Sequence, residues 1–92
     1  MLNQIALVGT LKEKPVYVDN GFLENNCYKA VITVEAEDGE SQNIDIYLWK
    51  QIAEVIYERY EEGTPVGLKG FLKQDKEQLY IITSRISFIT AE

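Results

Sequence analysis

The chain has 92 residues, of which 46% are hydrophobic and 26% are charged, as in an ordinary soluble globular protein. This length predicts one domain spanning residues 1–92, and no apolar run approaches the roughly 20 residues that a membrane helix needs. Histidine is absent and Cys27 is the single cysteine, which excludes an internal disulfide and removes the usual metal ligands and general bases. We therefore expect a cytoplasmic protein that is not an enzyme and holds no metal or cofactor.

The chain is acidic, with a net charge of −6 and an isoelectric point of about 4.6. This balance disfavours binding to nucleic acid, because contacts with phosphates need lysine and arginine. The acidic residues, however, cluster in two segments, 35–40 and 54–62, whereas most of the lysines lie elsewhere. The sequence is therefore compatible with a basic face on an acidic body.

The amino-terminal part of the chain predicts one strand. Residues 2–11 are apolar with β-branched members, and the strand is expected to end near Pro15. Residues 16–18 can continue it past a kink, until an Asp-Asn-Gly turn at residues 19–21 reverses the chain.

Two alternating segments follow and predict a β-hairpin. Residues 27–36 alternate with a period of two, which is typical of a strand with one face in a core. The Asp-Gly pair at residues 38–39 is a strong signal for the hairpin turn. The returning strand is expected over 42–49, with Tyr47 and Trp49 on its outward face.

The carboxyl-terminal half predicts a helix and two more strands. From Lys50 the apolar residues recur three or four positions apart, which indicates an amphipathic helix that stops at Gly63. Strands are expected over 66–73 and 78–89, joined by a polar turn at 74–77. Alternation predicts that one face of the last strand carries Tyr80, Ile82, Ser84 and Ile86.

The predicted order is β-β-β-α-β-β, an all-β fold with one short helix. Five strands with a helix between the third and fourth is the wiring of the oligonucleotide/oligosaccharide-binding barrel, the OB-fold. An SH3-like barrel lacks a helix at this place. A ferredoxin-like fold would need a helix after the first strand, where this chain has the turn near Pro15.

Three stretches carry motifs whose order and spacing are more specific than any one of them. The first stretch opens with Met-Leu-Asn and continues with Leu-Val-Gly-x-Leu, and a proline follows four residues later. In the second stretch an aromatic residue precedes an apolar-Ala-Glu triplet. In the third, a glycine precedes the pattern Val-x-apolar-x-Gly-x-Leu. A closing strand ends the match. The matching residues are Met1, Leu2, Asn3, Leu7, Val8, Gly9, Leu11, Pro15, Trp49, Ile52, Ala53, Glu54, Gly63, Val66, Leu68, Gly70, Leu72, Ile86 and Phe88.

Together these motifs resemble the bacterial single-stranded DNA-binding protein family over nearly the whole chain. The resemblance implies an OB-fold barrel that binds single-stranded DNA without sequence preference. It also implies dimers built at the amino-terminal strand and tetramers built from dimers. A homo-oligomer with single-stranded DNA as its partner, and replication proteins as further partners, is the resulting expectation.

The chain also departs from the family pattern. Gln4 and Thr10 stand where the family often has arginine, and Glu61 and Glu62 precede the glycine where it has basic residues. Both hairpin arms that wrap DNA in the family are short here, Asn43 lies near the place of a further aromatic residue, and the glycine-rich linker and acidic tail are missing from these 92 residues. The sequence is thus similar to short plasmid, phage or primosomal relatives.

Three outward aromatic residues are candidates for base stacking. Trp49 ends the third strand and matches the family's stacking aromatic residue; alternatively it caps the barrel or fills a subunit interface. Tyr47 shares its face and either extends the platform or packs against neighbouring strands. Phe71 lies between Lys69 and Lys73, an alternation that suits a base and a phosphate backbone, or an aromatic residue buried by a neighbouring subunit.

Lysines are the candidates for phosphate contacts. Lys73 comes first, because it matches a family position that is usually basic, and Lys12, Lys29 and Lys69 follow. Each of them, considered alone, is equally compatible with a simple surface lysine. Arg85 could serve either face of the sheet, and its role stays open.

Two functions remain at this point. The first is non-sequence-specific single-stranded DNA binding in replication, recombination or plasmid and phage DNA metabolism. The second is an OB-fold adaptor subunit of a replication or primosome complex with weak or no affinity for nucleic acid, which the acidic balance and short arms favour. RNA or oligosaccharide binding is a more distant alternative.

Overall fold

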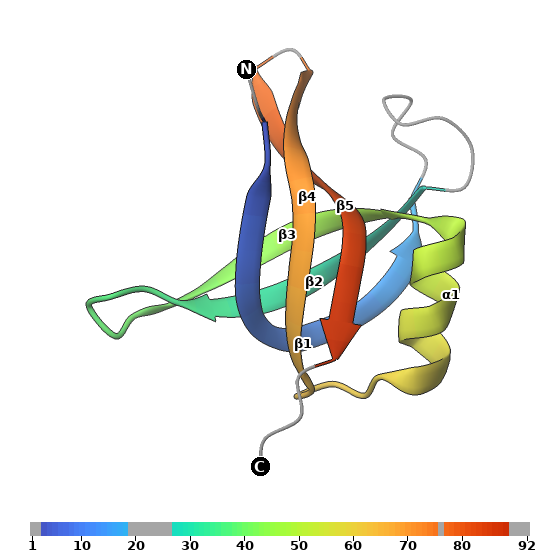
Figure 1. Cartoon of the computed structure of the whole chain (residues 1–92), viewed down its shortest axis with the longest axis horizontal. Helices are drawn as coiled ribbons and strands as arrows, with labels where there is room; N and C mark the ends of the chain where they lie inside the picture. The colour runs from blue at the N-terminus through green and yellow to red at the C-terminus, as the bar shows by residue number, and fades with distance from the viewer. Residues whose placement is uncertain (1–2, 19–26, 76, 89–92) are drawn as a thin grey trace.

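The computed structural model describes residues 3–18, 27–75 and 77–88. Five strands close into a barrel, and one helix joins the third strand to the fourth (Figure 1). The elements are β1 (Ile5–Tyr17), β2 (Cys27–Glu35), β3 (Ser41–Trp49), α1 (Lys50–Arg59), β4 (Pro65–Asp75) and β5 (Gln78–Phe88).

The strands follow the hydrogen-bonded order β1-β2-β3-β5-β4, and β4 returns to β1 to close the barrel. All neighbouring pairs are antiparallel except β3 with β5, which run parallel. This order, with the helix between β3 and β4, is that of the OB-fold. The fold predicted from the sequence is therefore confirmed.

The first strand continues past Pro15, as the sequence allowed for residues 16–18. It runs through Pro15 to Tyr17, pairing with β4 over residues 5–10 and with β2 from Thr10 onward. Two register shifts lie between Leu11 and Val16, so Pro15, which has no N–H to donate, sits where the ladder is already interrupted. The turn expected at residues 19–21 lies outside the described residues.

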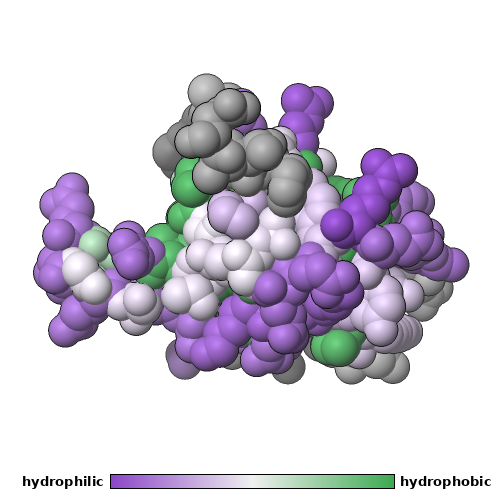
Figure 2. All heavy atoms as spheres, turned by 90° about the horizontal axis from the view of Figure 1, so that it is seen from below, coloured by the Kyte–Doolittle hydropathy of each residue, from purple (hydrophilic) through white to green (hydrophobic). Residues whose placement is uncertain are grey.

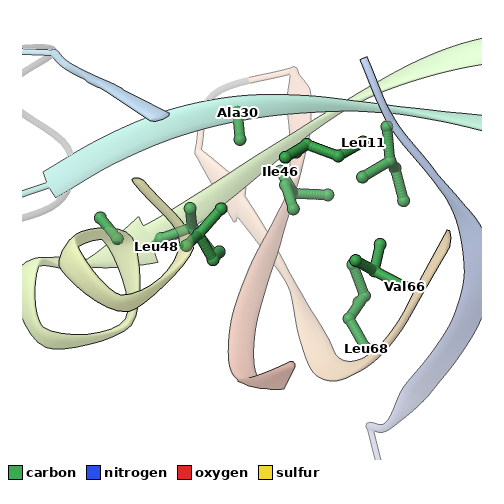
Figure 3. Packing of buried hydrophobic residues seen from close by; sticks show 9 residues of the cluster. Leu11, Ala30, Ile46, Leu48, Val66 and Leu68 are labelled. Carbon is green, nitrogen blue, oxygen red and sulfur yellow. The ribbon is translucent and has the colours of Figure 1, made fainter. Parts of the chain in front are cut away.

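One hydrophobic core fills the barrel, as alternation along the hairpin strands predicts. Even-numbered residues of β2 and β3 point inward, and the buried face of α1 adds Ala53 and Ile56 to the same cluster. Figure 3 shows the packing of Leu11, Ala30, Ile46, Leu48, Val66 and Leu68 within this core. The helix therefore completes the core at one end of the barrel. Among the described residues no helix is long and apolar enough to cross a membrane.

The helix ends earlier than predicted. Its last residue is Arg59, and Tyr60 follows in an extended conformation with φ of −113°. Gly63 instead forms part of the next turn, where its φ of +93° is one that other residues rarely adopt. Its N–H donates to the Leu11 carbonyl at 2.7 Å, so this glycine anchors the turn to β1 rather than stopping the helix.

The predicted face of β5 is wrong in its second half. Register shifts by one residue beside Gly70, so that Thr83 pairs with Gly70 and Arg85 with Lys69, and Ser84 has no opposite residue. As a result Tyr80 and Ile82 face outward, whereas Ile86 packs against the core. The two strands approach each other so closely here that a Cβ on Gly70 would collide with the Ile82 carbonyl oxygen.

Candidate nucleic-acid interface

A second apolar cluster lies outside the barrel, across β3, β5 and β4. Its centre is Ile82, which is buried and pairs with Tyr47 on one side and Phe71 on the other. Tyr80 packs against the same cluster, and its ring centroid lies 5.0 Å from that of Tyr47 at an angle of 74°. We call the group of Tyr47, Phe71, Tyr80 and Ile82 the aromatic face.

The three rings of the aromatic face are half-buried. Their packing around Ile82 and the edge-to-face contact of the two tyrosines restrict their rotation, whereas part of each ring stays open to solvent. Rings held in this way lose little freedom when a flat ligand stacks on them. The aromatic face can therefore bind unstacked bases of any sequence, since every base has a π-face.

Cationic residues from three strands surround the aromatic face. Lys73 pairs with Tyr80, Lys29 pairs with Tyr47, and Lys69 pairs with Arg85 one step further along β4 and β5. Alternation along β4 thus does bring Lys69 and Lys73 to the side of the sheet that carries Phe71, as the sequence predicted.

The cross-strand pair of Lys69 and Arg85 is unusual because both members are positive. Like charges directly opposite each other destabilise a sheet, and no acidic residue of the described chain forms an ion pair with either side chain. The pair borders a hollow of about 350 Å³ whose other lining residues carry no charge. These are Ala6, Leu7, Val8, Gly67, Leu68 and Ser87. An anion at this place would relieve the repulsion.

Lys29 is partly neutralised. Its Nζ lies 3.9 Å from a carboxylate oxygen of Asp45, on the strand next to it. The pKa of Tyr47 lies above its ordinary value because of burial first, and then because of the negative charge of Asp45 and its neighbours Tyr80 and Cys27. The Tyr47 phenol therefore stays neutral near neutral pH and does not repel a phosphate backbone.

Trp49 extends the aromatic face along β3. It follows Tyr47 by two residues and so points to the same side of the strand, and its cross-strand partner Cys27 belongs to the same outer cluster. The residue is 37% exposed. It also occupies the N-cap position of α1 without making a side-chain capping hydrogen bond, so its side chain is not used to start the helix.

Lys12 is the one predicted contact that the structure places elsewhere. It lines a surface pocket that also includes Thr33, Asn43 and Glu62. The residue of β1 that pairs with Lys69 is Ala6. Six residues of strand, roughly 20 Å along β1, therefore separate Lys12 from the pair of Lys69 and Arg85, whereas the β1 partner of Lys29 is Val16, four residues from Lys12.

Two residues of the site could not be assigned from the sequence. Alternation places Tyr80 on a face but indicates no role for it, and it leaves the side of Arg85 open. The outward position of Arg85 follows from the extra residue at Ser84, which reverses the alternation of β5, whereas Tyr80 precedes this residue and follows the predicted alternation. An unbroken period of two gives no sign of the extra residue; the small residues Gly70 and Ser84 are the single local signal of a bulge.

Most acidic residues lie away from the aromatic face, as the clustering in the sequence indicated. One acidic segment forms the β2–β3 hairpin, which protrudes as a hydrophilic arm at the left of Figure 2. The other lies on α1 and the turn after it. Among the described residues, no group of three or more Cys, Asp or Glu side chains is placed to hold a metal ion.

No family model and no curated protein matches the sequence, whereas many solved structures match the fold. The dimeric N-terminal domain of PriB from Thermoanaerobacter tencongensis is 18% identical, with a TM-score of 0.76 over 97% of this chain and 98% of that one. The mitochondrial single-stranded DNA-binding protein of S. cerevisiae is 14% identical, with a TM-score of 0.76 over the full length of both chains.

The small single-stranded DNA-binding protein of Streptomyces coelicolor is 23% identical, with a TM-score of 0.69 over 100% of this chain and 97% of that one. At these identities the likeness establishes a shared fold. The chain therefore has the barrel that these proteins share, in agreement with the resemblance seen in its motifs.

Proposed function

We propose that this protein binds single-stranded DNA without sequence preference, through the aromatic face and the cations around it. The observation that supports the proposal best is the convergence of half-buried rings from three strands with Lys29, Lys69, Lys73 and Arg85 on one side of the barrel. In an acidic chain such a gathering does not follow from composition.

The proposed binding mode divides the work between two groups. Bases stack on Tyr47, Phe71 and Trp49, which contributes roughly 1–3 kcal/mol per base, and the phosphates between them lie near the lysines and Arg85. A double helix offers no such contact, because its bases are stacked on one another. The acidic hairpin and the acidic segment 54–62 repel phosphates and so favour a path across the aromatic face.

In this proposal the protein is a binder and not a catalyst, and it serves replication, recombination or plasmid and phage DNA metabolism in the cytoplasm. Replication proteins are its expected protein partners. The fold similarity to single-stranded DNA-binding proteins supports this class of role, and the shortness of the arms favours a small footprint per barrel.

We further propose that the protein acts as a dimer or tetramer through its amino-terminal strand. Residues 5–9 of β1 pair with β4 on one edge, whereas pairing with β2 begins at Thr10. The other edge of this segment thus makes no strand pairing within the described chain, and Val8, which belongs to the segment, is 67% exposed. Pairing of two such edges would double the number of nucleotides that one particle covers.

A fluorescence titration tests the proposal. The single tryptophan is titrated with an oligothymidine longer than the roughly 4–16 nucleotides that one such barrel covers, at low and at high salt. We expect quenching that weakens as salt rises, because bound phosphates release counterions. Absence of binding at low salt, measured also by anisotropy of a labelled strand, would contradict the proposal.

A variant then locates the site. Trp49→Ala should weaken binding of the labelled strand by about 1–3 kcal/mol without changing the fold or the oligomeric state. If the variant unfolds or changes its oligomeric state instead, Trp49 has a structural role, and stacking has to be assigned to the other rings.

One observation favours a second candidate, the adaptor with little affinity for nucleic acid. The ion pair between Lys29 and Asp45 reduces the positive charge beside Tyr47, in a chain with a net charge of −6. On this alternative the aromatic face contacts a protein. The same titration separates the two candidates, since an adaptor gives no salt-dependent quenching.

A further inference from the structure

A pocket of about 210 Å³ lies between α1 and the neighbouring ends of β1 and β2. It shares no residue with the aromatic face, so the function proposed above does not account for it. Its lining consists of two tyrosines, two small or rigid apolar residues and two carboxylates: Tyr28, Tyr57, Pro15, Ala53, Glu54 and Glu58.

Of the two rings that line this pocket, Tyr57 is open to solvent and Tyr28 is half-buried against the core. Tyr57 is 59% exposed on the outer side of α1. Tyr28 is in edge-to-face contact with Tyr17, whose centroid lies 5.7 Å away and which is itself 54% exposed. Tyr17 and the exposed Val16 beside it extend the apolar surface from the pocket along β1. Exposed aromatic surface of this kind is typical of protein-binding sites.

Both charged residues that line the pocket are negative. Glu54 and Glu58 line it, and no lysine or arginine does. Glu54 is paired with Lys50 one helical turn earlier at 3.8 Å, whereas Glu58 forms no ion pair within the described chain. The pocket therefore repels phosphates and attracts a cation.

The chain itself shows that a cation is stable beside these rings. The Nζ of Lys14 lies 5.0 Å from the centroid of Tyr57, donates to the Tyr57 carbonyl at 3.2 Å and pairs with Glu61 at 3.6 Å. An ammonium, a tyrosine ring and a carboxylate already form one group at the edge of the pocket. Tyr28, Tyr57 and Glu58 offer the same combination of rings and carboxylate to a cation that enters from outside.

We propose that this pocket is a docking site for a basic segment of a partner protein, with one lysine or arginine side chain entering it. The cation interacts with Glu58 and with the tyrosine rings, and its aliphatic stem packs on Pro15 and Ala53. Apolar residues next to it in the partner lie over Val16 and Tyr17. The charge complementarity selects this occupant over nucleic acid or an acidic peptide.

Amide chemical-shift mapping of the complete 92-residue protein tests the proposal. The probe is a pentapeptide with one central arginine flanked by leucine and glycine, and the matched control is the same peptide with citrulline. We expect shifts confined to the amides around Tyr28, Ala53 and Glu58, and about fivefold weaker binding of the uncharged citrulline peptide.

Two variants identify the carboxylate. Glu58→Gln keeps the size of an exposed side chain and should weaken binding of the arginine peptide about threefold or more. Glu62→Gln, in the turn beyond the helix, should leave this binding unchanged. Neither variant should alter the binding of oligothymidine. Failure of the docking site is thus distinguishable from failure of the DNA-binding proposal.

Three outcomes would overturn the proposal. Equal binding of the citrulline peptide would show an apolar groove without preference for a cation. Shifts that spread over the acidic hairpin at residues 35–40 would show unspecific attraction to negative charge. Shifts at the pocket that depend on protein concentration in the absence of peptide would identify a second copy of this chain as its occupant.

Discussion

The barrel carries two surfaces that are made of similar parts and have opposite charge. On the aromatic face, Tyr47 and Tyr80 pair with Lys29 and Lys73 of neighbouring strands, and Lys69 pairs with Arg85 further along the sheet. At the pocket beside α1, two tyrosines lie beside two glutamates of the helix. A tyrosine ring accepts both kinds of neighbour, so the sign of the surrounding charge decides what each surface attracts.

This difference explains why the net charge of the chain is a poor guide to its partners. The value of −6 combines a cationic side, an acidic hairpin at residues 35–40 and the acidic segment 54–62, which includes part of α1 and the turn after it. A strand of nucleic acid senses the potential within about one Debye length, roughly 10 Å at moderate salt, and not the sum over the molecule. Separation of the two surfaces thus lets an acidic protein present a cationic side.

The two surfaces also differ in how firmly their rings are held. The rings of the aromatic face are half-buried around Ile82, whereas Tyr57 at the helix is 59% exposed. Preordered rings reduce the conformational entropy that the protein itself loses when a single strand binds. The helix pocket is better suited to a short, weakly bound protein segment.

The strongest way to break the aromatic face is to disturb the bulge that creates it. Gly70→Ala places a Cβ against the Ile82 carbonyl oxygen, and the backbone of β4 and β5 has to separate. We expect the free energy of unfolding to fall by about 3 kcal/mol. Chemical denaturation of the two proteins measures this difference.

A second glycine variant serves as the control. Gly39→Ala meets no atom within 4 Å, but its φ of +86° is unfavourable for alanine, so the expected loss is about 1 kcal/mol and arises from the backbone alone. Equal effects of the two variants would show that contact with Ile82 is not what requires glycine at position 70.

Reversal of the two opposed cations should have the next largest effect. The double variant Lys69→Glu with Arg85→Glu removes two proposed phosphate contacts and should weaken oligothymidine binding on the order of hundredfold at low salt. The slope of log K against log salt should also become shallower by about 0.7 for each phosphate that the variant no longer neutralises. Anisotropy titrations at several salt concentrations measure both quantities.

A charge reversal at the helix gives the matched comparison. Lys50→Glu changes an exposed residue of α1, whose partner Glu54 lines the other surface. If this variant weakens DNA binding as much as the double reversal, the effect comes from net charge, and the separation of the two surfaces has no functional meaning.

Much of the fold could be predicted because it depends on patterns within single elements. Alternation in β2, β3 and β4 and the helical period after Lys50 indicated the elements and the inward faces, and the Asp-Gly turn is found as expected, with Gly39 at φ of +86°. These features need no knowledge of neighbouring strands.

The wrong predictions concern features that depend on contacts between elements and not on patterns within one element. Apart from the small residues Gly70 and Ser84 themselves, nothing in the sequence indicates that β4 lacks a partner for Ser84, and this hid the outward position of Arg85. Likewise, the separation of Lys12 from Lys69 depends on the register of β1 with β4. Sequence reasoning could name candidate cations but could not group them.

Removal of one ring from each surface sharpens the comparison. Phe71→Leu keeps an apolar side chain against Ile82 but removes the π-face, and it should weaken oligothymidine binding about tenfold. Tyr57→Leu removes an exposed ring from the helix surface, so it should weaken binding of the arginine peptide and leave DNA binding unchanged. Thermal unfolding of both variants verifies that packing is preserved, and equal weakening of DNA binding in the two would contradict the assignment.

The smallest expected effect concerns the ionisation of Tyr47. Its negatively charged form is disfavoured by burial and by Asp45, so its pKa in the folded protein lies above the ordinary value of 10.0. The neutral phenol therefore contributes stability that is fully present below pH 10.0 and is lost as the pH rises through the folded pKa. Oligothymidine binding should then not weaken through Tyr47 between about pH 8 and pH 9.5.

Ultraviolet titration of the protein and of Tyr47→Phe isolates the ionisation of the Tyr47 phenol. Asp45→Asn should lower its pKa only in part, because burial is the larger cause; a return to the ordinary value would mean that Asp45, and not the packing of the aromatic face, keeps Tyr47 neutral.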